Sequence, residues 1–460
     1  MTLIKSISGI RGTIGGNISS NLTPLDTVLF TSAYACWLKK TIKAKQYKLV
    51  VGRDARISGN MIQGLVNQTL VGNGIDVLDV GLSTTPTVKL AVTQHQAHGG
   101  IIITASHNPK QWNALKLFNK RGEFINASSG EAILKIAEQQ EFQYALVDDL
   151  GKVIRVAGAI EYHVQKILEL PLINSKGISQ KKFKVVVDGV NSSGGIAIPL
   201  LLKALGVNTV TMYCDPTGDF PHNPEPLKEH LTALSERVSK EKADFGIVVD
   251  PDVDRLAFVD ENGAVFGEEY TLVACSDYVL SKTPGNTVSN LSSTQALSLI
   301  TFQRGGTHHA SAVGEVNVVD KMKKVKAVIG GEGNGGIIYP DLHYGRDALV
   351  GVALFLSLLV EKNQKVSVLR ASYPDFAMSK AKISLSKEMD VDSIFKKIER
   401  KFSKNNIITI DGVKISFESS WVHLRKSNTE AIIRVYTEAK SQLEADELAQ
   451  RFLGEIQEVI

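Results

Sequence analysis

The order of strand and helix patterns constrains this chain more than any other feature of its sequence. In the first third, apolar runs at 48–51, 75–80 and 99–104 alternate with helix-like stretches at 58–74 and 87–96. Parallel strands need a crossover connection, usually a helix, to bring the chain back to the same edge of the sheet. The first third therefore predicts a parallel sheet covered by helices.

The same order recurs farther along the chain with different residues. A second round has strand patterns at 183–187, 207–213 and 244–249. A weaker third round has a strand pattern at 256–259, a helix around 268–280 and an apolar run at 326–329. The element order repeats although the residues do not, which indicates three similar α/β units.

The C-terminal stretch follows another pattern. From about residue 378, strand patterns at 407–410, 413–417 and 432–436 are not separated by helices, and a helix follows from 441. This order is typical of an α+β domain with a mainly antiparallel sheet. We therefore expect an α/β protein: three similar α/β domains with mixed, mostly parallel sheets plus a smaller α+β C-terminal domain. The expected domain boundaries are 1–153, 154–254, 255–372 and 373–460.

Composition excludes several other classes of protein. Hydrophobic residues make up 43% and charged residues 22% of the 460, which excludes disorder over most of the length. The net charge of +4 is small for this length, so we expect no nucleic-acid partner. The three cysteines form no CxxC pair, which favours a reducing compartment and no structural zinc. Since the sequence has neither a signal-peptide core nor an apolar stretch of spanning length, we expect a cytoplasmic protein without membrane association.

The first of four loops that can carry chemistry is Thr-Ala-Ser-His-Asn-Pro at 104–109, which follows an apolar strand pattern. Ligands of parallel α/β units bind at the carboxyl ends of strands, and a serine there can act as a nucleophile or carry a phosphoryl group. Lys116 lies just downstream and is a candidate for proton transfer. The alternative is a simple turn in which Ser106 bonds backbone donors.

The second loop is Asp-Pro-Asp-Val-Asp-Arg at 250–255, directly after a strand pattern. Alternate residues of an extended segment point to the same side, so Asp250, Asp252 and Asp254 predict a site for a hard cation such as Mg²⁺. A solvated acidic turn is the alternative. An EF-hand is excluded because Arg255 stands where that loop needs glycine.

Two further loops suit a sugar and a phosphate. The glycine-rich segment 330–336 contains Glu332 and Asn334, whose side chains can bond sugar hydroxyls. The segment Arg-Lys-Ser-Asn-Thr-Glu at 425–430 is followed by Arg434, and guanidinium groups bind phosphate bidentately. The alternatives are a structural glycine turn for the first segment and a helix capping box for the second.

Taken in chain order, these four loops resemble the motifs of the α-D-phosphohexomutase superfamily, and the segment 8–13 is similar to the N-terminal motif of that family. The similarity covers essentially the whole chain, one loop per domain. The resemblance implies four domains around a central cleft and an enzyme that interconverts 6-phospho and 1-phospho sugars. It also implies a phosphoserine, one Mg²⁺ per active site, and a sugar 1,6-bisphosphate as intermediate and primer. The partners would be small-molecule sugar phosphates, and the chain would be a monomer or homodimer.

The resemblance also implies roles for individual residues. Ser106 would carry the phosphoryl group and Lys116 would transfer protons. The metal ligands would be a phosphoserine oxygen on Ser106 together with Asp250, Asp252 and Asp254. The residues near the transferred phosphoryl group would be Arg11, His107 and Arg255. The residues that bind the substrate would be Glu332, Asn334, Arg425, Ser427, Asn428, Thr429 and Arg434.

The sugar loop departs from the pattern of many relatives, since Asn334 replaces a serine and Gly336 replaces a histidine. Together with the segment 313–317, it resembles an archaeal-type branch assigned as phosphoglucosamine mutases or as phosphomannomutase/phosphoglucomutases. An acidic residue at Glu315 would suit the ammonium group of an amino sugar. We therefore expect conversion of glucosamine 6-phosphate to glucosamine 1-phosphate for UDP-N-acetylglucosamine synthesis, with phosphomannomutase/phosphoglucomutase activity as the alternative.

Two functions from other classes compete with this expectation. A haloacid-dehalogenase-like phosphatase also has Asp-x-Asp after an apolar strand and would use Asp250 as its nucleophile. The position of that motif in mid-chain and the Arg425 loop argue against it. A catalytically silent sugar-phosphate binder would not need Ser106, Lys116 and the three aspartates together.

Overall fold

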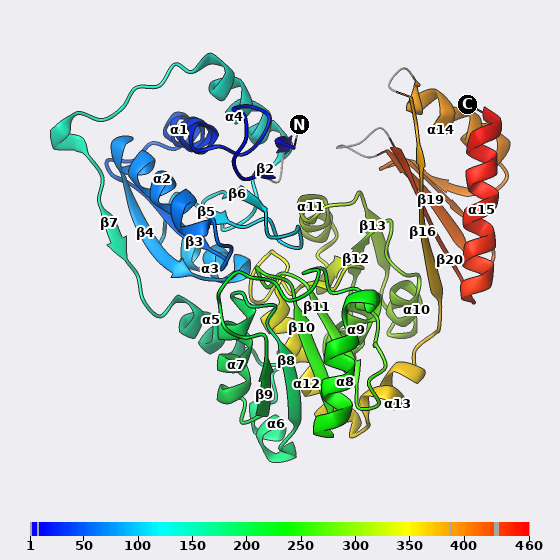
Figure 1. The fold of residues 1–460 in the computed structure, drawn as a ribbon. Coiled ribbons are helices and arrows are strands. Elements are labelled where there is room, and N and C mark those ends of the chain that lie inside the picture. The colour runs from blue at the N-terminus through cyan, green and yellow to red at the C-terminus, as the bar shows by residue number, and fades with distance from the viewer. Residues whose placement is uncertain (1, 7–8, 387–388, 427–431, 460) are drawn as a thin grey trace.

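The computed structural model describes residues 2–6, 9–386, 389–426 and 432–459. Within these residues the chain forms four units, each built on its own sheet (Figure 1). The first unit, coloured blue to cyan, and the fourth, coloured orange to red, lie at the top of the view on opposite sides. The second and third units lie below and join them.

The first unit contains a mixed, seven-stranded sheet. In spatial order, its strands are β1 (Ile4–Ser6), β2 (Gly9–Thr13), β6 (Trp112–Phe118), β5 (Gly99–Ile103), β3 (Tyr47–Arg53), β4 (Ile75–Leu82) and β7 (Val153–Arg155). Its helices are α1 (Pro24–Thr41), α2 (Gly59–Gly72), α3 (Thr85–Gln94) and α4 (Ala127–Gln139). The expected βαβαβ order is confirmed, because β3 pairs in parallel with both β4 and β5. Every residue of β5 is buried, as for a strand covered by helices on both faces.

The second unit contains a four-stranded sheet. In spatial order, its strands are β11 (Leu256–Asp260), β10 (Phe245–Val249), β8 (Lys184–Asp188) and β9 (Asn208–Met212). Its helices are α5 (Ala159–Leu168), α6 (Ser175–Lys181), α7 (Gly194–Ala204) and α8 (Thr232–Glu241). β11 pairs antiparallel with β10, so the strand expected to open the third unit closes the second sheet instead. We therefore propose that the second unit runs past residue 254 to the end of this hairpin.

The third unit also contains a four-stranded sheet. In spatial order, its strands are β13 (His308–Ser311), β12 (Thr287–Asn290), β14 (Ile329–Glu332) and β15 (Gly336–Ile338). Its helices are α9 (Glu268–Lys282), α10 (Ala296–Gln303), α11 (Glu315–Val325), α12 (Ala348–Lys362) and α13 (Val366–Ala371). A single hydrophobic cluster runs from the second unit into the third, whereas the first and fourth units have cores of their own. The middle of the molecule is therefore one packed body.

The fourth unit is smaller and, as expected, antiparallel. In spatial order, its strands are β16 (Ala377–Ser384), β20 (Ile432–Ala439), β19 (Trp421–Lys426), β18 (Val413–Ser416) and β17 (Asn406–Ile408). The helices α14 (Val391–Lys401) and α15 (Gln442–Val459) cover one face of this sheet (Figure 1). The expected fold class, three α/β domains and one α+β domain, is confirmed. None of the helices in the described part of the chain is long and apolar enough to cross a lipid bilayer.

Candidate active site

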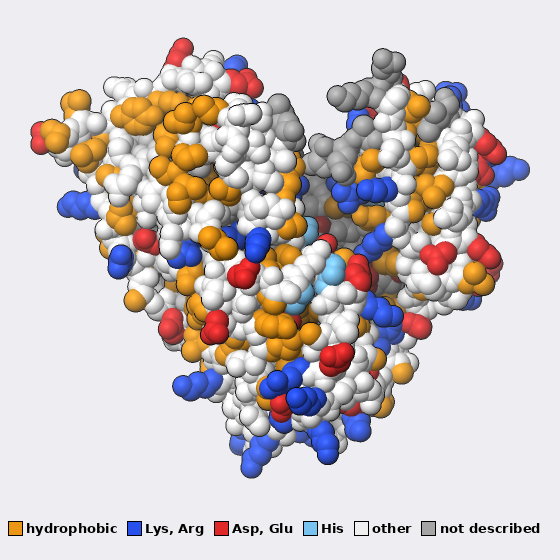
Figure 2. Space-filling model, viewed as in Figure 1, with side chains coloured by type: hydrophobic (Ala, Val, Ile, Leu, Met, Phe, Trp, Pro, Cys, Tyr) orange, Lys and Arg blue, Asp and Glu red, His pale blue; other side chains and the backbone are white. Residues whose placement is uncertain are grey.

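The four units meet around one cavity of about 830 Å³. Figure 2 shows the surface hollowed between the first unit and the fourth. Among the residues predicted for the site, the cavity is lined by Arg11, Ser106, His107, Lys116, Arg255, Glu315, Glu332, Asn334 and Arg425. Folding thus brings together residues from all four predicted loops. The predicted phosphate ligands Ser427, Asn428 and Thr429 lie outside the described residues.

The loop after β5 presents Ser106 to this cavity. The backbone of Ser106 is in the left-handed region, with φ of 49°, which costs energy for a residue other than glycine. Arg56 holds the loop in this shape, because its guanidinium donates to the carbonyl oxygens of Ser106, Asn108 and Pro109. Arg56 is 1% exposed and pairs with Asp54 at 3.1 Å. It is absent from the predicted site because only folding brings residue 56 beneath residue 106.

The hydroxyl group of Ser106 lies directly on the second loop. Ser106 Oγ donates a 2.6 Å hydrogen bond to Asp250 Oδ2. His107 Nδ1 lies 3.3 Å from the same Oγ atom. Ser106 and Asp250 come from different units, and each is at most 6% exposed. The predicted phosphoryl carrier and the predicted metal loop are therefore in contact.

The carboxylates of Asp250, Asp252 and Asp254 are fully buried, and one oxygen atom from each lies within 4.8 Å of the others. The turn that gathers them contains Val253 with φ of 62°, a strained conformation for a β-branched residue. Asp252 Oδ1 and Asp254 Oδ1 have no hydrogen-bond partner. Buried, unpartnered carboxylate oxygens are costly, and an all-oxygen set of ligands is what Mg²⁺ prefers. The arrangement fits a hard divalent cation.

The pKa values of Asp250 and Asp252 are shifted in opposite directions. Burial, followed by the charges of Asp252 and Asp254, raises the pKa of Asp250 well above its ordinary value. Burial would also raise the pKa of Asp252, but Lys116 holds it below its ordinary value. Lys116 Nζ lies 2.7 Å from Asp252 Oδ2 and 3.8 Å from Asp254 Oδ2. Burial lowers the pKa of Lys116, yet these two carboxylates raise it overall, so the amine is protonated.

Arg11, His107 and Arg255 line the cavity together with Ser106 and are called its basic wall. Glu225 links two of its members, because Oε1 lies 2.7 Å from Arg255 Nη1 and 3.9 Å from His107 Nε2. Burial, followed by the charge of Arg255, lowers the pKa of His107 well below its ordinary value, so its imidazole is neutral. Burial and the charges of Arg255 and Arg434 lower the pKa of Arg11. Cations that converge in this way suit an anion. Glu225 is missing from the predicted site, since a lone glutamate in a proline-rich loop carries no motif.

The sugar loop begins where β14 ends at Glu332, which is 4% exposed. Glu332 Oε1 accepts hydrogen bonds from Asn290 Nδ2 at 2.9 Å and from the backbone N–H of Gly314 at 3.0 Å. Its Oε2 accepts one from Arg346 Nη1 at 2.9 Å. Asn334 Oδ1 is buried without a partner, so it is able to accept a bond from a sugar hydroxyl.

Glu315 has partners that the sequence does not predict. Its Oε1 bonds to Lys89 Nζ, and its Oε2 lies 3.3 Å from Arg346 Nε. Burial would raise the pKa of Glu315, but Lys89 and Arg346 lower it overall. Both carboxylate oxygens are thus already paired with buried cations. Two buried cations already offset its charge, so Glu315 offers an ammonium group of a substrate little electrostatic attraction, which argues against direct recognition by Glu315.

The fourth unit also contributes residues to the cavity, among them Arg425. Arg425 on β19 and Arg434 on β20 are cross-strand partners, so both guanidinium groups leave the sheet on the same face. Like charges directly opposite each other destabilise a sheet, and an anion between them would relieve that repulsion. Arg425 Nε donates to Asp411 Oδ2 at 2.8 Å, and the backbone N–H of Val313 in the third unit donates to the same oxygen.

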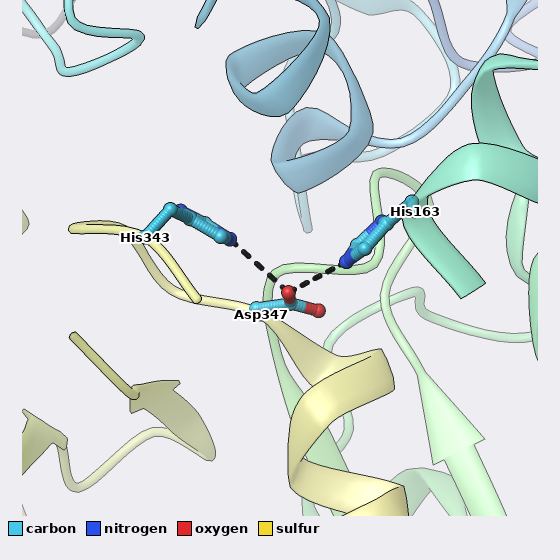
Figure 3. A group of neighbouring side chains, drawn as sticks. All are labelled: His163, His343 and Asp347. Carbon is cyan, nitrogen blue, oxygen red and sulfur yellow. Dashed lines mark hydrogen bonds and ion pairs between the residues drawn. The ribbon is translucent and has the colours of Figure 1, made fainter. Parts of the chain in front are cut away.

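A second group of titratable side chains lies away from the cavity and is not predicted from the sequence (Figure 3). Asp347 Oδ2 lies 2.8 Å from His163 Nε2 and 3.1 Å from His343 Nε2. Asp347 Oδ1 accepts from the backbone N–H groups of Leu349 and Val350 in the first turn of α12. On its other ring nitrogen, His163 bonds to the hydroxyl of Thr87 in α3 at 2.9 Å. These bonds form a network that ties the first three units together.

Four domain-family models match the chain in sequence order. Their descriptions are phosphoglucomutase/phosphomannomutase alpha/beta/alpha domain I at 3–144, domain II at 161–263, domain III at 267–376, and C-terminal domain at 378–455. Apart from β7, which lies between the first two ranges, the matched ranges follow the four sheets, and the second range includes β11.

Curated relatives are similar over almost the whole chain. A phosphoglucomutase/phosphomannomutase of Thermococcus kodakarensis is 32% identical over 455 residues, which cover 98% of each chain. A probable phosphoglucosamine mutase of Methanosphaera stadtmanae is 34% identical over 445 residues, which cover 95% of this chain and 94% of the relative. A phosphoglucosamine/phosphogalactosamine mutase of Sulfurisphaera tokodaii is 31% identical over 98% of each chain.

Solved structures share the fold. A phosphoglucomutase/phosphomannomutase family protein from Burkholderia thailandensis matches with a TM-score of 0.85 at 24% identity, covering 100% of this chain and 98% of its own. An N-acetylphosphoglucosamine mutase from Aspergillus fumigatus, in complex with GlcNAc-6P and magnesium, matches with a TM-score of 0.57 at 14% identity. That match covers 94% of this chain and 98% of the fungal one. At these identities the likeness concerns the fold alone.

Proposed function

The chain belongs to the phosphoglucomutase/phosphomannomutase family and is a phosphohexomutase, and we propose that it converts glucosamine 6-phosphate to glucosamine 1-phosphate. The reaction would run through phosphoserine at Ser106 and a glucosamine 1,6-bisphosphate. The observation that carries this proposal is the 2.6 Å bond from Ser106 Oγ to Asp250 Oδ2, at the edge of a cavity that Ser106 lines together with Arg425 of the fourth unit. A serine that contacts a candidate cation site, in the same cavity as a candidate phosphate-binding site, suits a substrate with a phosphate at either end.

In the proposed transfer, a sugar hydroxyl attacks the phosphorus atom on Ser106, and the bond from that phosphorus to Ser106 Oγ breaks. A divalent cation such as Mg²⁺, held by Asp250, Asp252 and Asp254, would supply charge neutralisation for the phosphoryl oxygens. The guanidinium groups of Arg11 and Arg255, which line the same cavity, would stabilise the same oxygens.

Lys116 is the group proposed to exchange a proton with the sugar hydroxyl. Its pKa is held up by Asp252 and Asp254, so it releases a proton more readily when those carboxylates are engaged by another cation. His107 is neutral and lies 3.3 Å from Ser106 Oγ, so it is able to accept the proton of the serine hydroxyl when a phosphoryl group returns to Ser106.

Arg425 and Arg434 would hold the phosphate that does not react. After the first transfer the bisphosphate carries two such groups, and a fixed clamp accepts either one once the sugar has turned around. The predicted ligands Ser427, Asn428 and Thr429 would complete that clamp. Turning of the intermediate requires the cavity to loosen its hold, and motion of the fourth unit, which has its own core, would allow this.

The preference for an amino sugar rests on the relatives named phosphoglucosamine mutase and on the variant sugar loop. It no longer rests on direct contact with Glu315, whose oxygens are paired with Lys89 and Arg346. Phosphomannomutase/phosphoglucomutase activity is the second candidate, since the relative from Thermococcus kodakarensis carries that name. In the first candidate reaction, the glucosamine 1-phosphate that forms would be consumed in UDP-N-acetylglucosamine synthesis.

The test of the sugar preference is a comparison of kcat/KM for glucosamine, glucose and mannose phosphates, with and without Mg²⁺. We expect the glucosamine pair to be turned over best, and only with the cation present. Equal or better turnover of glucose 1-phosphate would remove the proposed preference while leaving the mutase activity intact.

The test of the phosphoryl carrier is phosphopeptide mapping after incubation with a sugar 1,6-bisphosphate. An acid-stable phosphate on Ser106 supports the mutase mechanism. A hydroxylamine-labile phosphate on Asp250 would instead support the phosphatase. The Ser106→Ala variant should keep its fold and lose activity, and full activity of that variant would contradict the assignment.

A further inference from the structure

One buried arginine that the proposed mechanism does not use connects the metal loop with the sugar loop. Arg346 is 8% exposed and lines the cavity. Its Nη2 lies 2.6 Å from Asp254 Oδ2, and its Nη1 lies 2.9 Å from Glu332 Oε2. Its Nε lies 3.3 Å from Glu315 Oε2. The three edges of one rigid, planar group therefore bond carboxylates from three separate segments of the chain.

The network shown in Figure 3 fixes the backbone from which this arginine projects. Asp347 is in an extended conformation, with φ of −151° and ψ of 107°, and consecutive side chains of extended backbone point to opposite sides. Asp347 points away from the cavity and is held by His163, by His343 and by the N-terminus of α12. Arg346 points into the cavity. Because the backbone at its base is fixed, the Arg346 side chain has less conformational freedom to lose when it forms these bonds.

The sugar loop is shaped to admit this side chain. A Cβ atom added at Gly336 would lie 2.3 Å from Arg346 Cδ and 3.0 Å from Arg346 Cγ, so any larger residue at 336 would collide with the arginine. The glycine and the arginine therefore form a matched pair, which indicates that the place of Arg346 in the loop is a built feature of this chain.

Sharing one guanidinium group links the two loops energetically. Asp254 Oδ1 has no partner, whereas Asp254 Oδ2 is bonded to Arg346. A cation that binds Asp254 changes the charge that Arg346 faces on that side, and this alters the strength and angle of its bond to Glu332. A sugar hydroxyl that bonds to Glu332 changes the bond between Glu332 and the same guanidinium group. The two ligands thus act on one rigid group.

We infer that Arg346 is a positioning residue that couples cation binding at Asp254 to sugar binding at Glu332. This inference rests on the proposed function, because it takes the metal loop and the sugar loop to bind those ligands. Coupling between two sites is reciprocal: the factor by which Mg²⁺ changes the affinity for the sugar phosphate equals the factor by which the sugar phosphate changes the affinity for Mg²⁺. With Arg346 in place we expect each ligand to strengthen binding of the other.

The test is calorimetric titration of the dephosphorylated protein with Mg²⁺ and with glucosamine 6-phosphate, each alone and with the other at saturation. In the wild-type protein we expect a coupling factor of about fivefold or more. In Arg346→Gln, which keeps a polar side chain but cannot span three carboxylates, the factor should fall towards one while each ligand still binds alone. Arg304→Gln is the matched control, because Arg304 pairs with Asp277 outside the cavity. It should keep the wild-type factor.

If Arg346→Gln melts at a much lower temperature than the wild type, the same titrations are made with Arg346→Lys instead. Lysine restores the positive charge but is a point donor without the fork, so the coupling factor should again fall. A wild-type factor of one, or an unchanged factor in either variant, would overturn the inference while leaving the mutase intact. If the wild-type protein binds neither Mg²⁺ nor any of the three hexose phosphates, the proposed function fails first and the inference fails with it.

Discussion

Two residues of the candidate active site have strained backbone conformations. Ser106 and Val253 both have φ in the left-handed region, at 49° and 62°. Such conformations cost roughly 1–3 kcal/mol each and persist only where surrounding contacts determine them. For Ser106 those contacts come from Arg56, and for Val253 from the hairpin of β10 and β11. The strain aims the serine hydroxyl at Asp250 and gathers the three carboxylates.

Replacement of Arg56 tests how the serine loop is held. Arg56→Met leaves Asp54 buried without its cation and frees several carbonyl oxygens, so we expect a loss of stability of about 3–5 kcal/mol. Urea denaturation followed by circular dichroism measures this loss. Arg53→Met is the control, because Arg53 is more exposed and should cost clearly less. A loss below about 1 kcal/mol for Arg56→Met would contradict the supporting role.

Replacement of Lys116 tests the proton exchange. Lys116→Met preserves the length of the side chain but removes the amine beside Asp252, and we expect kcat to fall by about 10²–10⁴. Lys110→Met changes an exposed lysine of the same segment, which pairs with Asp219, and should leave kcat unchanged. Steady-state assays of both variants decide the matter, and a Lys116→Met enzyme within twofold of wild type would exclude the role.

At the level of secondary-structure elements, the loops proposed to carry chemistry lie where strands end or pair. β5 ends in the serine loop, β10 in the metal loop and β14 in the sugar loop, as expected for α/β units. The phosphate end differs, because Arg425 and Arg434 project from the antiparallel pair of β19 and β20. Periodicity predicts these strands well. It does not predict their partners, which is why the strand at 256–259 is expected in the wrong sheet.

The cross-strand arginine pair leads to a prediction in which binding and stability respond differently. Arg434→Gln removes one of the guanidinium groups proposed to bind the phosphate, so KM for the sugar phosphate should rise roughly 10- to 100-fold. It also removes a like-charge neighbour of Arg425, so the melting temperature should not fall. Arg451→Gln on α15, an exposed position, serves as the control for KM. A rise in KM accompanied by a large drop in melting temperature would indicate a structural role instead.

At the level of the whole molecule, buried polar contacts join the units around the cavity. The network of Asp347 ties the first three units together, and His423 joins the fourth to the third. His423 is 1% exposed, with Nδ1 2.9 Å from Ser292 Oγ and Nε2 2.6 Å from the carbonyl oxygen of Asp411. Burial, with a further contribution from Lys414, lowers the pKa of His423 to about 4.

This lowered pKa predicts the pH dependence of stability. Between about pH 6.5 and pH 4 the unfolded chain binds a proton at His423 that the folded chain does not, so stability falls as the pH decreases, by up to about 1.4 kcal/mol per unit. His423→Gln can keep both hydrogen bonds without titrating. Urea unfolding midpoints measured from about pH 6.5 down to about pH 5 should therefore fall less steeply for the variant. Identical slopes for both proteins would show that His423 does not contribute.

The sequence alone was enough to predict the fold class, because strand and helix periods are local properties of neighbouring residues. It also predicts candidate loops for chemistry, since Ser106, the three aspartates and Glu332 follow apolar strands at recognisable spacing, and residues of the predicted loops line one cavity. Only the tertiary structure decided how those loops meet. Ser106 and Asp250 are 144 positions apart, and their bond depends on how two separate units pack.

The tertiary structure alone also decided which residues support the candidate active site. Arg56, Glu225 and Arg346 are single charged residues without a motif, and each acquires its role from partners on distant segments. Glu315 is the converse case, because its predicted role depended on free oxygens that folding pairs with Lys89 and Arg346. Local sequence determines which groups are available. The packing of the units determines which of those groups are already satisfied and which face the ligand, because hydrogen bonds and ion pairs form across any separation in sequence once packing brings the groups together.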